Sequence, residues 1–231
     1  MIAPQVTSPQ AIFFDVGNTL LFRDQERILA PLQRRGIVPP PDQLHAVERR
    51  TKHEFDESVA RGGDVDRGFW DTYYTHLLEE LGVQDEPLRH ELVAATRISA
   101  NWCEILPGTR EALDRLRRQY RLAVISNADG KIAEVLAKCG IADCFAAITD
   151  SGLVGHEKPH PAIFQAALRE MAADAGQSLY VGDVYSVDYM GATGAGMQAT
   201  LFDVCGAYRD TGLPRVESMQ ELEEKLKDGA A

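Results

Sequence analysis

Residues 11–20 read AIFFDVGNTL, an apolar run that leads directly into a carboxylate, Asp15. A short run of apolar residues without alternation is typical of a strand that is covered on both faces. Residues 11–17 are therefore predicted to form or flank a buried strand. Four later runs have the same texture: RLAVISN (121–127), CFAAIT (144–149), SLYVGD (178–183) and QATLFDV (198–204).

Helical patterns separate these runs. Residues 109–120, 130–139 and 161–171 each place apolar side chains on one helical face. Alternation of strands and helices predicts a parallel sheet with helices on both faces. The fold class is therefore predicted to be α/β, with a Rossmann-like core.

A long insertion interrupts this pattern directly after the first strand. Between about Leu21 and Cys103 there is no strand-like run. Four amphipathic helices are predicted there, over about 24–35, 42–60, 66–81 and 86–102, and the aromatic stripe of the third is interpreted as packing within the insertion. We expect an α/β core of residues 1–21 and 104–231 and a small all-helical cap domain of residues 22–103.

Composition excludes several classes of protein. The chain has 231 residues, of which 45% are hydrophobic and 26% charged, as in ordinary globular proteins. A net charge of −11 disfavours nucleic acid and anionic membranes as partners. No run is long enough to span a bilayer, and the first ten residues contain neither Lys nor Arg, so a cytoplasmic protein is expected. None of the four cysteines has CxxC spacing, which argues against a zinc site.

Polar side chains gather where the predicted strands end. Parallel strands share one carboxyl edge, and functional groups collect beyond it. The candidates there are Asp15, Ser126, Asn127, Lys158, Asp183 and Asp188. Three crowded carboxylates repel one another unless a cation lies between them, and oxygen ligands without His or Cys favour Mg²⁺. Ser, Lys and backbone N–H groups complement phosphate, so the pattern indicates phosphoryl transfer.

The order of these motifs resembles the haloacid dehalogenase (HAD) superfamily. FFDVGNTL is similar to its first motif, VISN to the second, Lys158 followed by Pro159 to the third, and GDVYSVD to the fourth. The resemblance covers the whole chain, and the insertion resembles the helical cap that follows motif one in subfamily I.

The resemblance implies a role for each matching position. Asp15 would be the nucleophile and a metal ligand, and the backbone carbonyl of Gly17 would be a second ligand. Asp183 would bind Mg²⁺ directly. Asp188 would bind it through a water molecule or would support the residues that bind it. Ser126 and Lys158 would hold the phosphoryl group, and Lys158 would also act in catalysis by offsetting charge on Asp15. Asn127 would orient the substrate or the nucleophile. The implied activity is Mg²⁺-dependent hydrolysis of small phosphorylated metabolites through an aspartyl-phosphate.

One position departs from the family pattern. Family phosphatases usually carry a second Asp two residues after the nucleophile, where it protonates the leaving group, and this chain has Gly17. General acid–base help is typically worth about 10²–10⁴ in rate. If activity persists without it, His53 and Glu54 of the cap are the next candidates for that role.

Two alternatives to a phosphatase stay open. A catalytically weak protein that binds a phosphate ligand or a partner is one, because Gly17 lacks a side chain. A phosphonate C–P hydrolase that uses Lys52, the only lysine of the cap, as a Schiff base is the other. Arg23 is the one cap-proximal residue that we single out for substrate specificity. The oligomeric state is left open.

Overall fold

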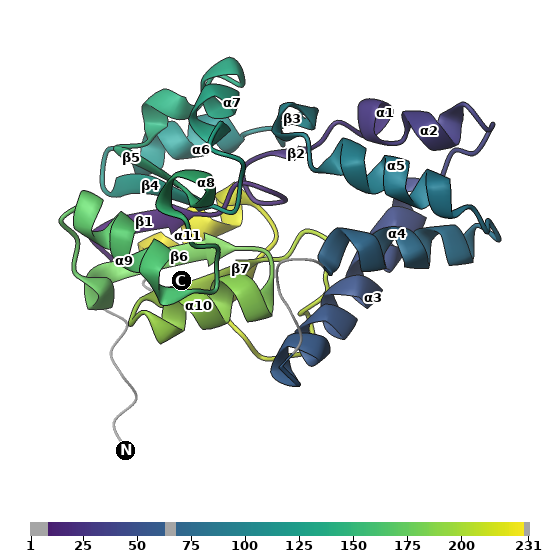
Figure 1. The fold of residues 1–231 in the computed structure, drawn as a ribbon. Coiled ribbons are helices and arrows are strands. Elements are labelled where there is room, and N and C mark those ends of the chain that lie inside the picture. Colours follow the sequence, from purple (N-terminus) through teal and green to yellow (C-terminus); the bar gives the residue numbers. More distant parts are fainter. Residues whose placement is uncertain (1–8, 63–67, 229–231) are drawn as a thin grey trace.

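The computed structural model describes residues 9–62 and 68–228, and its core is a six-stranded parallel sheet (Figure 1). The strand order is β5-β4-β1-β6-β7-β8. The bounds are β1 (Ala11–Phe14), β4 (Arg121–Ser126), β5 (Ala147–Asp150), β6 (Ser178–Gly182), β7 (Gln198–Phe202) and β8 (Arg215–Val216). The α/β, Rossmann-like class predicted from the sequence is confirmed.

Alternate residues of β1 explain why helices cover both faces. Ile12 and Phe14 pack in one apolar cluster with α6 (Thr109–Leu116), α7 (Ile132–Lys138) and α11 (Met219–Asp228). Ala11 and Phe13 pack in a second cluster, with α9 (Pro161–Glu170) and α10 (Met190–Gly194). Because successive strand side chains point to opposite faces, an uninterrupted apolar run requires this double cover. The remaining short elements of the core are α8 (Ser151–Val154), η2 (Ala142–Cys144), η3 (Ala175–Gln177) and η4 (Tyr185–Tyr189).

Strand β1 lies in the middle of the sheet and determines where the polar residues meet. It is parallel to β4 and β6, and Phe14 is opposite Val124 and Val181. The backbone N–H of Asp15 donates to the carbonyl of Val181 (2.8 Å). The three strands thus end together, and the residues that follow them share one edge.

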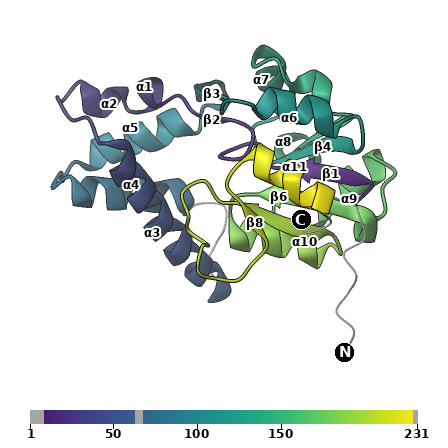
Figure 2. The ribbon, with the colours of Figure 1, turned by 180° about the vertical axis from the view of Figure 1, so that it is seen from behind.

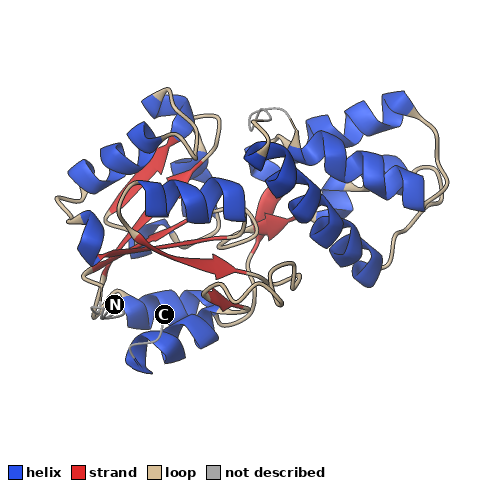
Figure 3. Ribbon diagram, turned by 90° about the horizontal axis from the view of Figure 1, so that it is seen from below, coloured by secondary structure: helices blue, strands red, loops and turns tan. Residues whose placement is uncertain are grey.

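The insertion after β1 forms a separate helical layer beside the core (Figures 2 and 3). Its helices are α1 (Gln25–Ile28), α2 (Ala30–Gln33), α3 (Pro41–Ala60), α4 (Phe69–Glu80) and α5 (Glu86–Thr96). They bury an apolar cluster of their own that includes Val47, Tyr74, Leu77 and Leu92. We call this segment the cap. Its division from the core at residues 22 and 103 stays a prediction.

Short strands that were not predicted from the sequence join the cap to the core. Strand β2 (Phe22–Arg23) pairs antiparallel with β3 (Trp102–Glu104). Strands of two and three residues are too short to show a period in the sequence.

The first and last predicted cap helices were too long. The first is divided into α1 and α2, where Pro31 lies in the first turn of α2. The last ends at Thr96 and is followed by the 3₁₀ turn η1 (Ser99–Asn101), because side chains of Asn101 and Trp102 donate to the carbonyls of Ala95 and Thr96 (both 2.8 Å). Residues 66 and 67 of the third predicted helix lie outside the described residues.

None of the helices in the described part of the chain combines the length and apolar character that crossing a lipid bilayer requires.

Candidate active site

The carboxyl edge of the sheet and the cap enclose a cavity of about 550 Å³, which we call the catalytic cavity. All the site residues predicted from the sequence line it: Asp15, Gly17, Ser126, Asn127, Lys158, Asp183 and Asp188. They come from separate segments of the chain, which only the parallel sheet brings together.

Three buried carboxylates form the floor of the catalytic cavity. Oxygen atoms of Asp15, Asp183 and Asp188 lie within 4.8 Å of one another. Burial raises the pKa of Asp15 to about 7, against the pull of nearby Lys158, and the charges of Asp188 and Asp183 raise it further. Burial also raises the pKa of Asp183. The cluster therefore holds its negative charge at an energetic cost that a bound cation would relieve.

Lys158 partly neutralises this cluster. Its Nζ donates to Asp15 Oδ1 (2.6 Å) and to Asp188 Oδ1 (2.8 Å), and the side chain is almost fully buried. The two carboxylates raise the pKa of Lys158 although burial opposes it. The ammonium group is thus a fixed positive charge beside the Asp15 carboxylate.

Two residues that were not predicted from the sequence hold the carboxylates and the ammonium of the floor in place. The Tyr180 hydroxyl accepts from Lys158 Nζ (2.8 Å) and donates to Asp188 Oδ1 (2.9 Å). Asn18 Nδ2 donates to Asp183 Oδ2 (3.3 Å), and Asn18 has a positive φ of 51°. A tyrosine inside a predicted buried strand was a usable signal, because its hydroxyl needs a partner there.

Asp188 and Asn127 are already held by the protein. Asp188 Oδ2 accepts from the backbone N–H of Val184 (3.0 Å), so both of its oxygens have protein donors. A Cβ on Gly182 would lie 2.5 Å from Asp188 Cγ, which explains the glycine at the end of β6. Asn127 accepts from the Lys158 N–H (2.7 Å) and donates to the Lys158 carbonyl (3.1 Å). Its amide therefore positions Lys158 in this structure.

A chain of charges runs from the floor into the cap. Lys52 of α3 is 1% exposed, and its Nζ lies 2.8 Å from Asp183 Oδ2 and 3.2 Å from Glu48 Oε1. Glu48 in turn pairs with Arg23 (3.1 Å). Despite burial, the charges of Asp183 and Glu48 raise the pKa of Lys52. The cap thus contributes a second ammonium to the acidic cluster.

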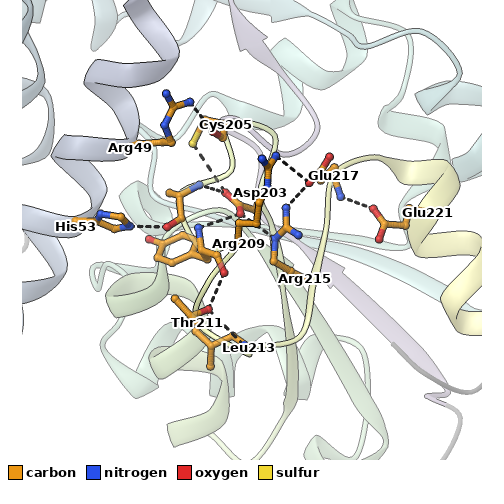
Figure 4. A network of polar contacts seen from close by, with 12 residues as sticks. Arg49, His53, Asp203, Cys205, Arg209, Thr211, Leu213, Arg215, Glu217 and Glu221 are labelled. Carbon is orange, nitrogen blue, oxygen red and sulfur yellow. Dashed lines mark hydrogen bonds and ion pairs between the residues drawn. The ribbon is translucent and has the colours of Figure 1, made fainter. Parts of the chain in front are cut away.

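Lys52 belongs to a polar face of α3 that docks on the core. Arg49 donates to the carbonyl of Cys205 (2.9 Å), and His53 Nε2 pairs with the carbonyl of Ala207 (2.5 Å; Figure 4). Asp56 accepts from the Ser186 N–H (2.9 Å) and from the Tyr208 hydroxyl (2.8 Å). Positions 49, 52, 53 and 56 share one face of a helix. These contacts hold the cap over the carboxyl edge.

The other cap residues that the sequence singled out are engaged elsewhere. Arg23 lies over the rings of Trp70 (4.9 Å) and Tyr73 (4.7 Å) and lines a neighbouring cavity, not the catalytic one. His53 is held by Ala207, and Glu54 pairs with His76 (3.0 Å). Neither His53 nor Glu54 lines the catalytic cavity.

The residue that occupies the place of the missing acid is Trp102. A Cβ on Gly17 would lie 3.2 Å from Cζ3 of the Trp102 indole. Gly17 does not have a left-handed φ, so its backbone alone does not demand glycine. An aromatic ring therefore borders Gly17, two residues after Asp15, where family phosphatases usually carry a carboxylate.

The donor set fits Mg²⁺. The carboxylates of Asp15, Asp183 and Asp188 supply only oxygen, and their oxygens are close enough to share one ion. Hard oxygen ligands with partial positive compensation nearby are the usual environment of Mg²⁺ in sites that handle phosphate.

Comparison with known proteins shows the family of the chain. A family model of haloacid dehalogenase-like hydrolases matches residues 9–196. The chain belongs to this family. Human haloacid dehalogenase-like hydrolase domain-containing protein 3 is 32% identical to this HAD-like hydrolase over 205 residues, which are 81% of this chain and 79% of the human protein. The glyceraldehyde 3-phosphate phosphatase of Pyrococcus abyssi is 30% identical over 204 residues, 84% of this chain and 81% of that protein.

Solved structures share the fold of this HAD-like hydrolase. The HAD-hydrolase YfnB from Bacillus subtilis, solved bound to magnesium, has a TM-score of 0.70 at 18% identity and covers 95% of this chain and 99% of its own. A HAD phosphatase from Thermococcus onnurineus has a TM-score of 0.61 at 22% identity and covers 94% of this chain and 97% of its own.

Proposed function

We propose that this HAD-like hydrolase is a Mg²⁺-dependent phosphatase that acts on small phosphorylated metabolites through an aspartyl-phosphate on Asp15. The observation that carries the proposal is the position of Asp15 at the end of β1, 2.6 Å from a buried ammonium and beside two further buried carboxylates. Relatives named as phosphatases support the same reaction class.

The proposed reaction has two displacements at phosphorus. In the first, an Asp15 carboxylate oxygen attacks phosphorus, and the bond to the leaving oxygen breaks with its electron pair on that oxygen. In the second, water attacks the phosphorus of the aspartyl-phosphate, which releases inorganic phosphate and restores the carboxylate. Lys158 offsets charge at Asp15 and, with Ser126, binds the phosphoryl oxygens.

Mg²⁺ would be held by Asp15, the Gly17 carbonyl and Asp183, with Asp188 as further support. When bound, it would neutralise charge that accumulates on the phosphoryl oxygens. Asn127 keeps Lys158 in place through its two backbone bonds. Tyr180 fixes Asp188 and Lys158 relative to each other.

Hydrolysis of 4-nitrophenyl phosphate with and without Mg²⁺ tests the proposal. Its leaving group needs no protonation, so the absence of an acid at position 17 is not limiting. Turnover that depends on Mg²⁺ and stops on addition of EDTA is the expected result. No turnover of this ester and of a panel of metabolites would favour the binding-protein alternative.

Replacing the nucleophile gives a sharper test. Asp15→Asn should lower turnover to less than about 1% of wild type, because an amide is a far weaker nucleophile than a carboxylate. The matched control is Asp210→Asn, which changes an exposed carboxyl and should leave turnover unchanged. Mass spectrometry must exclude deamidation of the new amide back to Asp. Retention of more than a few per cent would remove Asp15 from the nucleophile role.

The phosphonate hydrolase alternative gains no support from the geometry. A Schiff base requires a neutral amine with access to the substrate. The Lys52 ammonium is paired with two carboxylates, and Lys52 lines the neighbouring cavity, not the catalytic one.

A further inference from the structure

Half of the residues with which the cap and its junction line the catalytic cavity are aromatic; the others are Gly68, Thr96, Arg97 and Ser99. Phe55, Phe69, Trp70 and Trp102 all line it, and we call them the aromatic wall. Their rings contact one another in sequence: Phe55 and Phe69 at 5.5 Å, Phe69 and Trp70 at 5.0 Å, and Trp70 and Trp102 at 5.5 Å between centroids. Every contact is edge-to-face, a favourable geometry for aromatic pairs.

A further contact holds each of the two tryptophans of the aromatic wall. Trp102 Nε1 donates to the carbonyl of Thr96 (2.8 Å), which fixes the indole plane. The Arg23 guanidinium lies over Trp70 at 4.9 Å. Phe69, Trp70 and Trp102 are nevertheless only half-buried, and all three line the cavity.

The wall reaches the nucleophile. The six-membered ring of Trp102 borders Gly17, two residues after Asp15. Since the phosphoryl group must lie against Asp15, the leaving group extends from there into the space that the wall bounds. An apolar aromatic surface adds more affinity for a flat ring, which it can contact edge-to-face, than for the short polar chain of a triose.

Position 17, beside the aromatic wall, carries no carboxyl group. Of the described residues, the other carboxyl groups that line the cavity are Asp129 and Glu157, and Asp129 already accepts from Ser99 Oγ (2.9 Å). The Trp102 ring borders position 17, where family phosphatases usually carry a proton donor. A leaving group that departs as a stabilised anion does not need that donor.

We propose that the preferred substrates are phosphate monoesters whose ester oxygen is borne by a flat conjugated ring. The proposal rests on the proposed phosphatase function and narrows its substrate class. The P–O bond breaks with its electron pair on the ring oxygen, where conjugation spreads the charge. The resulting aryloxide leaves and takes its proton from water, while Asp15 holds the phosphoryl group.

Binding of two phosphonates tests this without turnover. Phenylphosphonate and cyclohexylphosphonate carry six-carbon rings of similar size, and only the first is flat. Calorimetric titration of wild-type enzyme in Mg²⁺ should give phenylphosphonate about threefold to tenfold tighter. Equal affinities, tighter cyclohexylphosphonate or no binding of either would overturn the proposal.

A pair of variants locates the effect. Phe69→Leu keeps an apolar side chain but removes a ring of the wall, and it should bring the two affinities within about twofold of each other. Phe145→Leu removes a ring that packs on Phe14 (6.2 Å) away from the catalytic cavity, and it should leave the ratio unchanged. An unchanged ratio in Phe69→Leu would contradict the wall as its source. If that variant does not fold, the wild-type ratio still decides.

Kinetic measurements distinguish the proposed substrate class from the proposed phosphatase activity on which it rests. Phenyl phosphate should have a kcat/KM at least tenfold above that of glyceraldehyde 3-phosphate. Equal or reversed values with good turnover would refute the substrate class and leave the phosphatase standing. No turnover of either, with phenylphosphonate still bound more tightly, would refute the phosphatase and leave the ring site.

Discussion

Lys158 shows how one residue organises the site. Its ammonium contacts Asp15, Asp188 and the Tyr180 hydroxyl, and its backbone is held at both polar atoms by Asn127. A buried ammonium among carboxylates is favourable only while its hydrogen bonds are complete. The Lys158 side chain can therefore stay charged only while its contacts hold it in this position.

The surroundings of Gly17 determine what an aspartate introduced at this position would do. Gly17→Asp faces no left-handed strain, but its Cβ meets the Trp102 ring at 3.2 Å, so the indole must yield. Overpacking of this kind costs about 1–3 kcal/mol. We expect a folded, less stable enzyme whose turnover of alkyl phosphates rises about tenfold or more, because their basic leaving group must gain a proton.

The measurement is the dependence of kcat/KM on leaving-group pKa in wild type and in Gly17→Asp. Wild type should show a steep dependence and the variant a flatter one. Gly17→Asn is the control, because it fills the same space without an ionisable group. Equal gains from Asn and Asp would assign the effect to packing against Trp102.

Among the elements, the loop after β7 carries much of the cap's docking. Asp203 is fully buried and accepts from the N–H groups of Ala207 (2.7 Å) and Tyr208 (3.0 Å) and from Arg215 Nε (2.9 Å; Figure 4). The carbonyls of Cys205 and Ala207, which contact α3, lie in the loop that this carboxylate shapes.

Asp203→Asn should destabilise the protein by about 3 kcal/mol, because an amide NH₂ would face backbone donors and Arg215 would keep only its exposed partner Glu217. Urea unfolding followed by circular dichroism measures this. Asp210→Asn, an exposed change a few residues further on, should alter stability by less than about 0.5 kcal/mol. Similar losses in both variants would contradict the role given to Asp203.

Helix α3 also brings a competitor to the acidic cluster. Lys52 Nζ lies 2.8 Å from Asp183 Oδ2, so the ammonium competes for this carboxylate with any cation that binds there. Lys52→Met should therefore tighten Mg²⁺ binding about tenfold, and Lys52→Arg should leave it near the wild-type value. Calorimetric titration with Mg²⁺ gives both constants. Weaker Mg²⁺ binding in Lys52→Met would show that the ammonium supports the metal site instead.

The sequence predicted those parts of the site that follow apolar runs. Asp15, Ser126 and Asp183 come directly at or after buried strands, and parallel pairing necessarily gathers strand ends. Lys52 and Trp102 could not be assigned in this way. Their contacts depend on how the cap lies against the core, which no local pattern in either segment encodes.

For the molecule as a whole, the buried carboxylates link stability to pH. Asp15 has a pKa of about 7 in the folded protein and an ordinary value of 3.8 when exposed. Between these values the folded state binds more protons than the unfolded state, so this group's stabilising contribution is complete below pH 3.8 and is lost as pH rises through 7. Asp183 acts in the same direction.

We therefore expect the free energy of unfolding in EDTA to fall from about pH 5 to about pH 8 by more in wild type than in Asp15→Asn. Mg²⁺ binds the ionised carboxylates, so the rise in Tm that it produces should be larger at the higher pH than at the lower one. Urea unfolding and thermal scans at both pH values measure the two effects. Parallel pH profiles of wild type and Asp15→Asn would contradict the elevated pKa.

The pairing of β2 with β3 has a consequence for how such a chain is assembled over evolutionary time. Arg23 and Trp102 are partners across this ladder, so the chain leaves the core and re-enters it at neighbouring points. Directly paired antiparallel residues lie only about 5 Å apart. The two ends of the insertion therefore lie close together in the core, and the residues between them pack around an apolar cluster of their own. Recombination at this junction can exchange one cap for another, or shorten it to a turn, while the strand register that aligns Asp15 with its neighbours is retained.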